Sequence, residues 1–194
     1  SHWLPLAEAF KAVHFPGDLG QTELARERLA LEEFIRFQRQ IRERRKTFQA
    51  KVKALECSGD DRLVKPFLAG LGFEFTGAQQ RAWDEIARDM AGSYPMRRLL
   101  QGDVGSGKTV VALLAMLTAV ETGAQAALMA PTEILARQHL ATIGPLAAAI
   151  GIEVAVLTGR DKGQARAAAR ARVASGAAAL VIGTHALFQD GVEF

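Results

Sequence analysis

The residues best suited to chemistry lie between Gly102 and Thr109, which fill every fixed position of the pattern G-x-x-x-x-G-K-[ST]. The glycines let backbone N–H groups converge on phosphate oxygens without obstruction from side chains. Lys108 offers a positive charge to the β and γ phosphates, and the Thr109 hydroxyl is a ligand for Mg²⁺. We therefore predict a phosphate-binding loop made of Gly102, Asp103, Val104, Gly105, Ser106, Gly107, Lys108 and Thr109, with Lys108 and Thr109 as the catalytic candidates.

A phosphate-binding loop of this kind joins a buried strand to a helix. The short stretch Arg98 to Gln101 predicts the strand, and the apolar run Thr109 to Leu117 predicts the helix. The free amides at the start of that helix add a dipole that favours phosphate. The dinucleotide pattern G-x-G-x-x-G fails, because Val110 stands where its third glycine would fall, so NAD is not the expected ligand.

The rest of the second half alternates between apolar strands and helices. The pattern predicts strands at 126–130, 154–157 and 179–182. It predicts helices at 109–121, 132–150 and 162–174, and Gly144-Pro145 is a candidate break in the second of them. Apolar strands joined by helical crossovers indicate an α/β fold with a parallel sheet covered on both faces.

The first part of the chain has a different character. From Thr22 to about Leu55 there is no glycine or proline, and apolar residues recur at steps of three, four or seven. This predicts a long amphipathic helix with Thr22 as its N-cap, followed by a shorter helix from Leu63 to Leu71. We therefore divide the chain into a helical linker region, residues 1–70, and a nucleotide-binding domain, residues 71–194.

Charge is unevenly distributed although the net charge is only +3. Residues 1–70 carry 13 basic and 10 acidic side chains, whereas residues 71–194 carry 11 of each. Residues 36–53 contain eight basic side chains and a single acidic one, Glu43. The basic residues are Arg36, Arg39, Arg42, Arg44, Arg45, Lys46, Lys51 and Lys53. This basic run fits either contact with a polyanion or a solvated helix face.

Composition limits the setting in which the protein works. Cys57 is the single cysteine, which excludes an internal disulfide and a cysteine-based metal cluster. The longest apolar run, Val110 to Val120, is too short to span a bilayer, and the first residues lack the pattern of a signal peptide. We expect a cytoplasmic protein without a membrane partner, and a monomer.

Small hydroxylic residues follow three of the predicted strands, in Pro131-Thr132, Thr158-Gly159 and Thr184-His185. If these turns share one edge of the sheet, they form a row of donors for a sugar–phosphate backbone. Further upstream, the Gln79 amide is suited to pair with an adenine edge, and Phe73 or Phe75 could cover the ring. Taken alone, Thr76 and Gln79 also fit a helix cap and its first turn.

In order and spacing these segments resemble the motifs of superfamily 2 helicases and translocases. Gly102 to Thr109 resembles motif I, Ala130 to Ala136 motif Ia, Leu157 to Gly159 motif Ib and Gly183 to Gln189 motif Ic, and Thr76 to Gln79 is similar to the Q motif. The resemblance covers residues 72–194 and implies a RecA-like domain that forms the first lobe of a motor. It implies ATP and Mg²⁺ as cofactors, with Gln79 reading adenine and Thr109 holding the metal. The DNA contacts that it implies are Pro131, Thr132, Gln138, Thr158, Gly159, Thr184 and His185.

The resemblance further implies an ATP-driven helicase or translocase that acts on double-stranded and branched DNA, remodelling forks and Holliday junctions in recombination and repair. A transcription-repair coupling translocase carries similar motifs. From other classes, a phosphate-loop kinase and a nucleotide-regulated binding module fit the loop as well.

One feature departs from the motor pattern. Such motors carry an Asp-Glu pair after the next strand, but the segment Asp190 to Glu193 has no adjacent carboxylates, and a second motor lobe is absent. We therefore expect these residues to be part of a longer protein, to bind ATP weakly and to hydrolyse none at a measurable rate on their own.

Overall fold

The computed structural model describes residues 3–188 and 191–194, so Gln189, the last residue of the predicted motif Ic, and Asp190, the first of the segment without an Asp-Glu pair, lie outside it. The chain forms two compact units, Ser1–Lys53 and Ala54–Phe194. This boundary falls earlier than the one predicted after residue 70. The reason is that residues 63–71 pack into the core of the second unit instead of continuing the linker.

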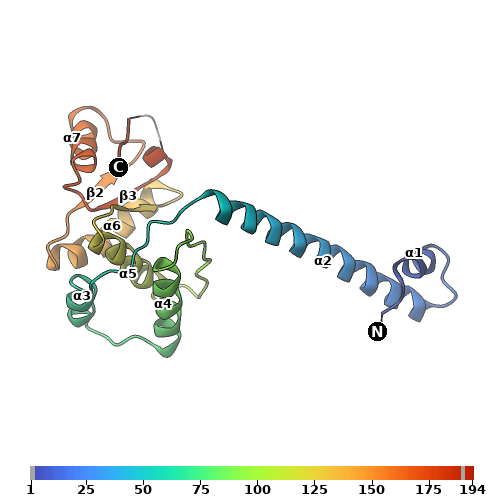
Figure 1. Ribbon diagram of the computed structural model, residues 1–194. Coiled ribbons are helices and arrows are strands. Elements are labelled where there is room, and N and C mark those ends of the chain that lie inside the picture. Colours follow the sequence, from blue (N-terminus) through green and yellow to red (C-terminus); the bar gives the residue numbers. More distant parts are fainter. Residues whose placement is uncertain (1–2, 189–190) are drawn as a thin grey trace. The chain divides into compact units, whose positions relative to one another are not determined.

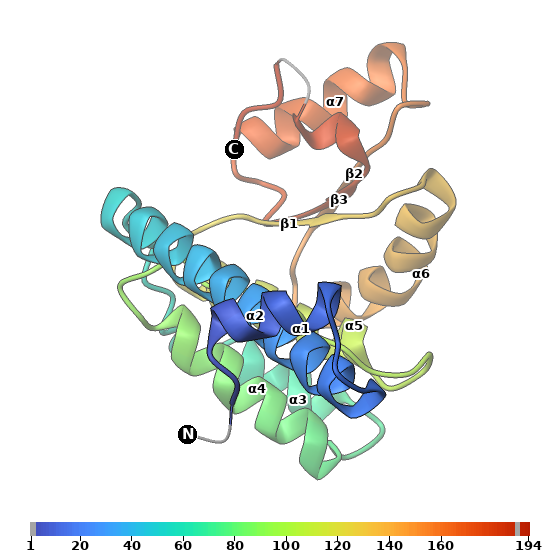
Figure 2. The same cartoon turned by 90° about the vertical axis from the view of Figure 1, so that its right-hand side faces the viewer.

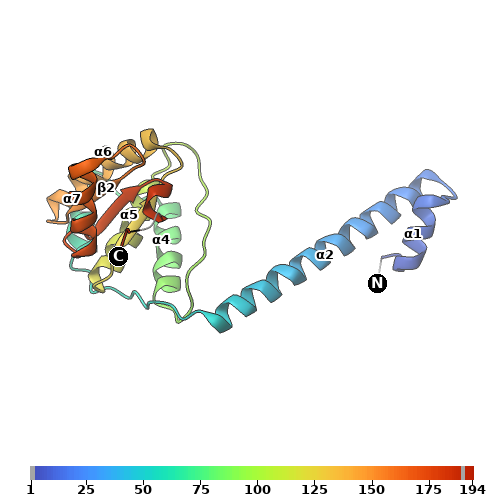
Figure 3. The same cartoon turned by 90° about the horizontal axis from the view of Figure 1, so that it is seen from above.

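The first unit consists of two helices, α1 (Leu6–His14) and α2 (Leu19–Lys51). Figure 3 shows α1 lying beside only the N-terminal part of α2. Ala9 and Ala25, one from each helix, are both fully buried. The Arg28 guanidinium donates a hydrogen bond of 3.0 Å to the carbonyl of Leu4, which fixes the chain ahead of α1.

The long helix was predicted correctly, but its ends were not. Asp18 is the N-cap, because its carboxylate accepts a hydrogen bond of 2.7 Å from the Gln21 amide. Thr22 lies inside the helix, and its hydroxyl donates to the carbonyl of Asp18. An ionised cap near the helix dipole outcompetes a threonine four residues later. The helix ends at Lys51, before Leu55.

The second unit alternates helices with a small parallel sheet (Figure 1). The sheet has the order β1-β3-β2, and both pairs of neighbours are parallel, as predicted. None of the described helices is both long and apolar enough to cross a membrane. In chain order the elements are α3 (Val64–Gly70), α4 (Gly77–Met90), α5 (Lys108–Glu121), β1 (Ala126–Met129), α6 (Glu133–Ala149), β2 (Val154–Leu157), α7 (Gly163–Ala174), β3 (Leu180–Gly183) and the 3-10 helix η1 (His185–Phe188).

Helices cover both faces of this sheet, and Figure 2 shows α5 and α7 on its opposite sides. On β3 the side chains alternate: Leu180 and Ile182 join the core formed with α3, α5 and α6, whereas Val181 joins the core formed with α7. All three side chains are fully buried. The middle strand is therefore apolar at every position, as a strand buried on both faces must be.

One predicted strand is not formed, and one candidate helix break does not occur. The stretch Arg98 to Gln101 is extended but pairs with no strand of the described chain, and Leu99 is 89% exposed. The helix α6 continues through Gly144 and Pro145, since packing of Ile143 and Ala147 in the core outweighs the one backbone hydrogen bond that a proline removes.

A buried carboxylate fastens the start of α3 to the end of α5. Glu121 is only 8% exposed, and its two carboxylate oxygens accept four backbone hydrogen bonds. Oε2 accepts from the amides of Asp60 and Asp61 at 3.2 and 3.1 Å, and Oε1 accepts from those of Leu63 and Val64 at 2.6 and 2.9 Å. Glu121 thus satisfies amides that would otherwise be unpaired at the N-terminus of α3.

Candidate nucleotide and nucleic-acid site

The predicted phosphate loop runs from the extended stretch before it into α5, so its helix is confirmed and its strand is not. Gly105 and Gly107 have φ angles of 82° and 80°, in the left-handed region that favours glycine. A Cβ atom on Gly107 would also clash with the side-chain nitrogen Nε2 of Gln79. Backbone conformation therefore requires glycine at these two positions, and a side chain at Gly107 would in addition displace the end of the Gln79 side chain.

The loop presents a set of unused donors. Within the described part of the chain, the amides of Gly105, Gly107, Lys108 and Thr109 make no hydrogen bond. Lys108 Nζ donates to the carbonyls of Gly102 and Asp103, at 2.8 and 2.6 Å. Adjacent free amides at a helix N-terminus, with a lysine folded over them, form a site for an anion.

Gln79 connects α4 to the phosphate loop. Its Oε1 accepts a hydrogen bond of 2.8 Å from the Thr76 amide, and the Thr76 hydroxyl accepts one from the Gln79 amide, which completes a capping box. Its Nε2 donates to the carbonyl of Ser106 at 2.9 Å. The cap predicted for Thr76 and Gln79 is confirmed, and the same side chain also reaches the loop.

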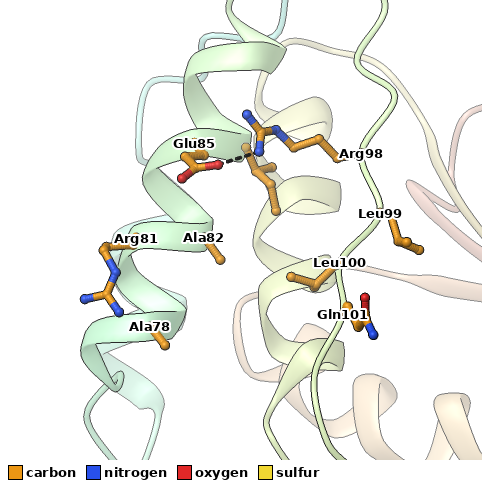
Figure 4. Close-up of a pocket in the computed structure, with 9 residues that line it drawn as sticks. Ala78, Arg81, Ala82, Glu85, Arg98, Leu99, Leu100 and Gln101 are labelled. Carbon is orange, nitrogen blue, oxygen red and sulfur yellow. Dashed lines mark hydrogen bonds and ion pairs between the residues drawn. The ribbon is translucent and has the colours of Figure 1, made fainter. Parts of the chain in front are cut away.

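A cavity of about 360 Å³ lies between α4 and the extended stretch before the loop. In Figure 4, Ala78, Ala82 and Glu85 of α4 face Arg98 and Leu100 across it. Arg98 bonds to both Asp89 and Glu85, each at 2.5 Å. The hydrogen bond that Arg98 donates to Asp89, followed by the one it donates to Glu85, raises the pKa of the Arg98 guanidinium. These bonds hold the extended stretch against α4.

The contact between Gln79 and the loop can be tested with Gln79→Glu. The carboxylate can still accept from Thr76, so the cap stays, but it repels the Ser106 carbonyl. We expect binding of fluorescent ATP to weaken about 3- to 10-fold, the value of one hydrogen bond, with thermal stability unchanged. Equal losses for ATP and GTP would show that Gln79 acts on the loop alone, and a larger loss for ATP would show base reading. Unchanged affinity for both nucleotides would contradict a functional contact.

The three turns with hydroxylic residues begin at the same level of the sheet. Met129 pairs with Gly183, and Gly183 pairs with Leu157, so all three strands end in one row. The amide of Ala130 donates to the Gly183 carbonyl, and that of Thr184 donates to the Leu157 carbonyl. The predicted common edge is thus confirmed, with the turn after β3 in the middle.

Not all of the predicted side chains are accessible at this edge. Pro131, Thr132 and Gln138 are exposed, and the Thr132 hydroxyl caps α6 by accepting from the Leu135 amide. His185 is exposed, and the half-buried Thr184 has a hydroxyl without a hydrogen bond within the described residues.

Thr158 differs from the other two threonines because it is fully buried. Its amide and hydroxyl both donate to the Asp161 carboxylate, at 2.6 and 2.8 Å. The expectation that the Thr158 hydroxyl faces a nucleic acid is therefore corrected. This side chain is buried and stabilises its own turn through Asp161. The neighbouring Gly159 is exposed and keeps its candidate role.

Sequence reasoning missed two cations at the same edge. Glu133 bonds to Arg137 of the same helix at 2.9 Å and to Arg160, in the turn after β2, at 3.3 Å. The two arginine side chains are 58% and 86% exposed. The spacing of four residues from Glu133 could have indicated Arg137, but no local signal places Arg160 next to them.

The phosphate loop lies toward the same edge as the turns. The helix α5 packs against β1 and joins its start through residues 122–125. With 14 residues α5 is about 21 Å long, whereas the four residues of β1 span about 13 Å. The opposite end of α5, with Lys108, therefore reaches to the carboxyl end of the sheet, where ligands of parallel α/β sheets bind.

The loop, the crossover helices and the shared strand ends define a phosphate-loop nucleotide-binding domain of the RecA-like type that helicases use. Comparison with known proteins makes the assignment specific: residues 76–193 match the model of the DEAD/DEAH box helicase family. The chain belongs to this family, whose members use ATP.

Similar proteins extend over nearly the whole chain. The chain is 46% identical to the ATP-dependent DNA helicase RecG of Escherichia coli (strain K12), over 98% of this chain and 28% of that protein. It is 42% identical to RecG of Bacillus subtilis (strain 168), over 96% of this chain and 27% of that protein. The chain thus spans little more than a quarter of the length of these relatives.

Solved structures agree with the sequence comparison. The structure of RecG bound to a three-way DNA junction is similar with a TM-score of 0.87 and 41% identity, over 100% of this chain and 26% of that one. A hypothetical ATP-dependent RNA helicase from Sulfolobus tokodaii shares the fold over 69% of this chain, with a TM-score of 0.50 and 20% identity. The likeness to RecG includes the helical unit as well as the sheet.

Proposed function

We propose that this chain forms the ATP-binding and DNA-tracking lobe of an ATP-dependent DNA helicase that remodels branched DNA. The observation that carries the proposal is the placement of the phosphate loop and the three strand-end turns at one edge of the sheet. The relatives named RecG, one of them bound to a three-way junction, support the same assignment. The family match favours a motor over a phosphate-loop kinase.

In this proposal the loop binds the triphosphate through backbone amides and a lysine that already lie together before ATP binds. The free amides of Gly105, Gly107, Lys108 and Thr109 donate to phosphate oxygens, and Lys108 exchanges two carbonyl acceptors for charged ones. Mg²⁺, when bound with ATP, would neutralise phosphate charge, with the Thr109 hydroxyl as its ligand from the loop. No group of three or more acidic, histidine or cysteine side chains gathers as a metal site within the described residues.

DNA would lie along the row of strand ends. Thr132, Thr184 and the exposed Gly159 offer hydroxyl or amide groups, and Arg137 and Arg160 add positive charge. Such groups bind the sugar–phosphate backbone and carry no sequence information. A lobe that moves along DNA requires contacts of this kind.

The DNA contact is tested by Thr184→Val, which removes the hydroxyl but keeps the shape of the side chain. If the hydroxyl donates to a phosphate, affinity for a three-way DNA junction should fall about tenfold, the value of a hydrogen bond to a charged group. Fluorescence anisotropy measures the affinity, and Thr142→Val, at an exposed position of α6, serves as the matched control. Equal affinity of the Thr184 variant and the unmodified chain would contradict this contact. A complete lack of DNA binding by the unmodified chain would count against the motor assignment itself.

A further inference from the structure

The helix α2 carries a stripe of arginines that the site above does not use. Arg36, Arg39 and Arg42, called the basic stripe below, follow one another at steps of three residues. At 100° per residue they lie within an arc of about 120° and extend about 9 Å along the helix. All three residues are exposed, and they make no ion pair or hydrogen bond with any described residue. Lys46 lies in the same arc but pairs with Glu43 at 3.3 Å.

The opposite side of the same helix is apolar. Phe34, Phe37 and Ile41 are 59%, 57% and 42% exposed, and their positions centre on the direction opposite to the basic stripe. The first part of α2 has the reverse charge balance, with Glu23, Glu27, Glu32 and Glu33 against Arg26 and Arg28. The second part of α2 is therefore rich in positive charge, and within it the basic stripe gathers three unpaired arginines on one side, which suits a polyanion.

We propose that the basic stripe binds the phosphate backbone of duplex DNA. The inference rests on the proposed function, because that function brings duplex DNA to the protein. Duplex DNA carries one negative charge for about every 1.7 Å of its axis, so the length of the stripe faces several phosphates. Three exposed guanidinium groups on long side chains can pair with them without a fixed register.

The placement of the aromatic side chains favours a duplex over a single strand. Sites for single-stranded nucleic acid combine cations with aromatic rings on which the bases stack. Here Phe34 and Phe37 point away from the basic stripe, so a strand that pairs with the arginines cannot stack on them. In a duplex the bases already stack on one another, so binding does not require aromatic side chains next to the arginines.

The test compares two triple variants of the whole 194-residue chain. Arg36→Gln, Arg39→Gln and Arg42→Gln together remove the basic stripe, while Arg44→Gln, Arg45→Gln and Lys51→Gln remove as many charges from other directions of α2. Glutamine keeps helix propensity, and circular dichroism checks the helix content. Binding to duplex DNA is measured by anisotropy over a series of salt concentrations.

We expect the basic-stripe variant to lose affinity and to show a smaller dependence of log K on log salt. The slope should fall by about 0.9 for each lost phosphate contact, or about 2.7 for three. The control variant should keep a slope close to that of the unmodified chain. Equal slopes for the basic-stripe variant and the unmodified chain would overturn the proposal, as would a loss confined to single-stranded DNA.

Two further measurements separate the possible failures. Binding to phosphatidylserine vesicles that is lost in the basic-stripe variant, while its DNA binding persists, would assign the stripe to a membrane surface and overturn the proposal. Binding of fluorescent ATP and the effect of Thr184→Val report on the second unit alone. If both behave as expected while the basic stripe has no effect on DNA, the proposed function stands without this inference.

Discussion

Lys108→Ala is expected to weaken ATP binding by about 10- to 100-fold, because it removes charged hydrogen bonds worth about 1.5 to 3 kcal/mol from the phosphates. The loop itself should keep its shape. Among the described residues, the Lys108 side chain donates two hydrogen bonds, both to carbonyls of the loop, and Gly102 and Asp103, which supply these carbonyls, are exposed. Titration with fluorescent ATP measures the change.

The matched control is Lys65→Ala, which removes a lysine from a surface ion pair with Asp61, outside the loop. Exposed pairs of this kind contribute little, so its ATP affinity should equal that of the unmodified chain. Equal affinity of the Lys108 and Lys65 variants would show that the loop does not bind the triphosphate. A parallel loss for ADP of smaller size would place Lys108 at the γ phosphate as well as the β.

Glu121→Ala is expected to destabilise the second unit by about 3 kcal/mol or more, because it leaves up to four partly or fully buried amides without an acceptor. The loss should appear as a lower midpoint of denaturant unfolding for residues 54–194. The start of α3 should also exchange its amide hydrogens faster, since Leu63 and Val64 lose their partner.

Glu121→Gln separates charge from shape in this interaction. The glutamine retains one acceptor oxygen, but its amide group directs hydrogens at two backbone donors, so a large part of the destabilisation should persist. Glu43→Ala, in an exposed pair on α2, is the control and should change stability by less than about 1 kcal/mol. An unfolding midpoint unchanged by Glu121→Ala would show that solvent replaces the carboxylate.

The sequence was sufficient wherever local pattern and tertiary structure agree. The strands β1, β2 and β3 are continuous apolar runs, and they were placed within about two residues. The phosphate loop followed from its residue types, because no other arrangement of backbone requires that spacing of glycines. Alignment of the three turns followed from parallel pairing alone.

Interactions over long sequence distances could not be predicted. Arg98 to Gln101 has the composition of a strand, but a strand needs a neighbour, and its own residues do not specify one. Glu121 is separated by about 60 residues from the backbone amides that it binds. In the sequence alone it is indistinguishable from an ordinary polar residue at the end of an apolar helix. The burial of Thr158 depends on Asp161, whose role is visible only once the turn is built.

The alignment of the strand ends separates what can vary in this domain from what cannot. A residue inserted into β3 would shift its end by about 3.3 Å and turn its side chains to the other face, which breaks both cores at once. A residue inserted after Met129, Leu157 or Gly183 would leave the row intact and lengthen only one turn. The sheet therefore tolerates no change in strand length. The surface along which a DNA strand would bind can instead be altered one turn at a time, without refolding the domain.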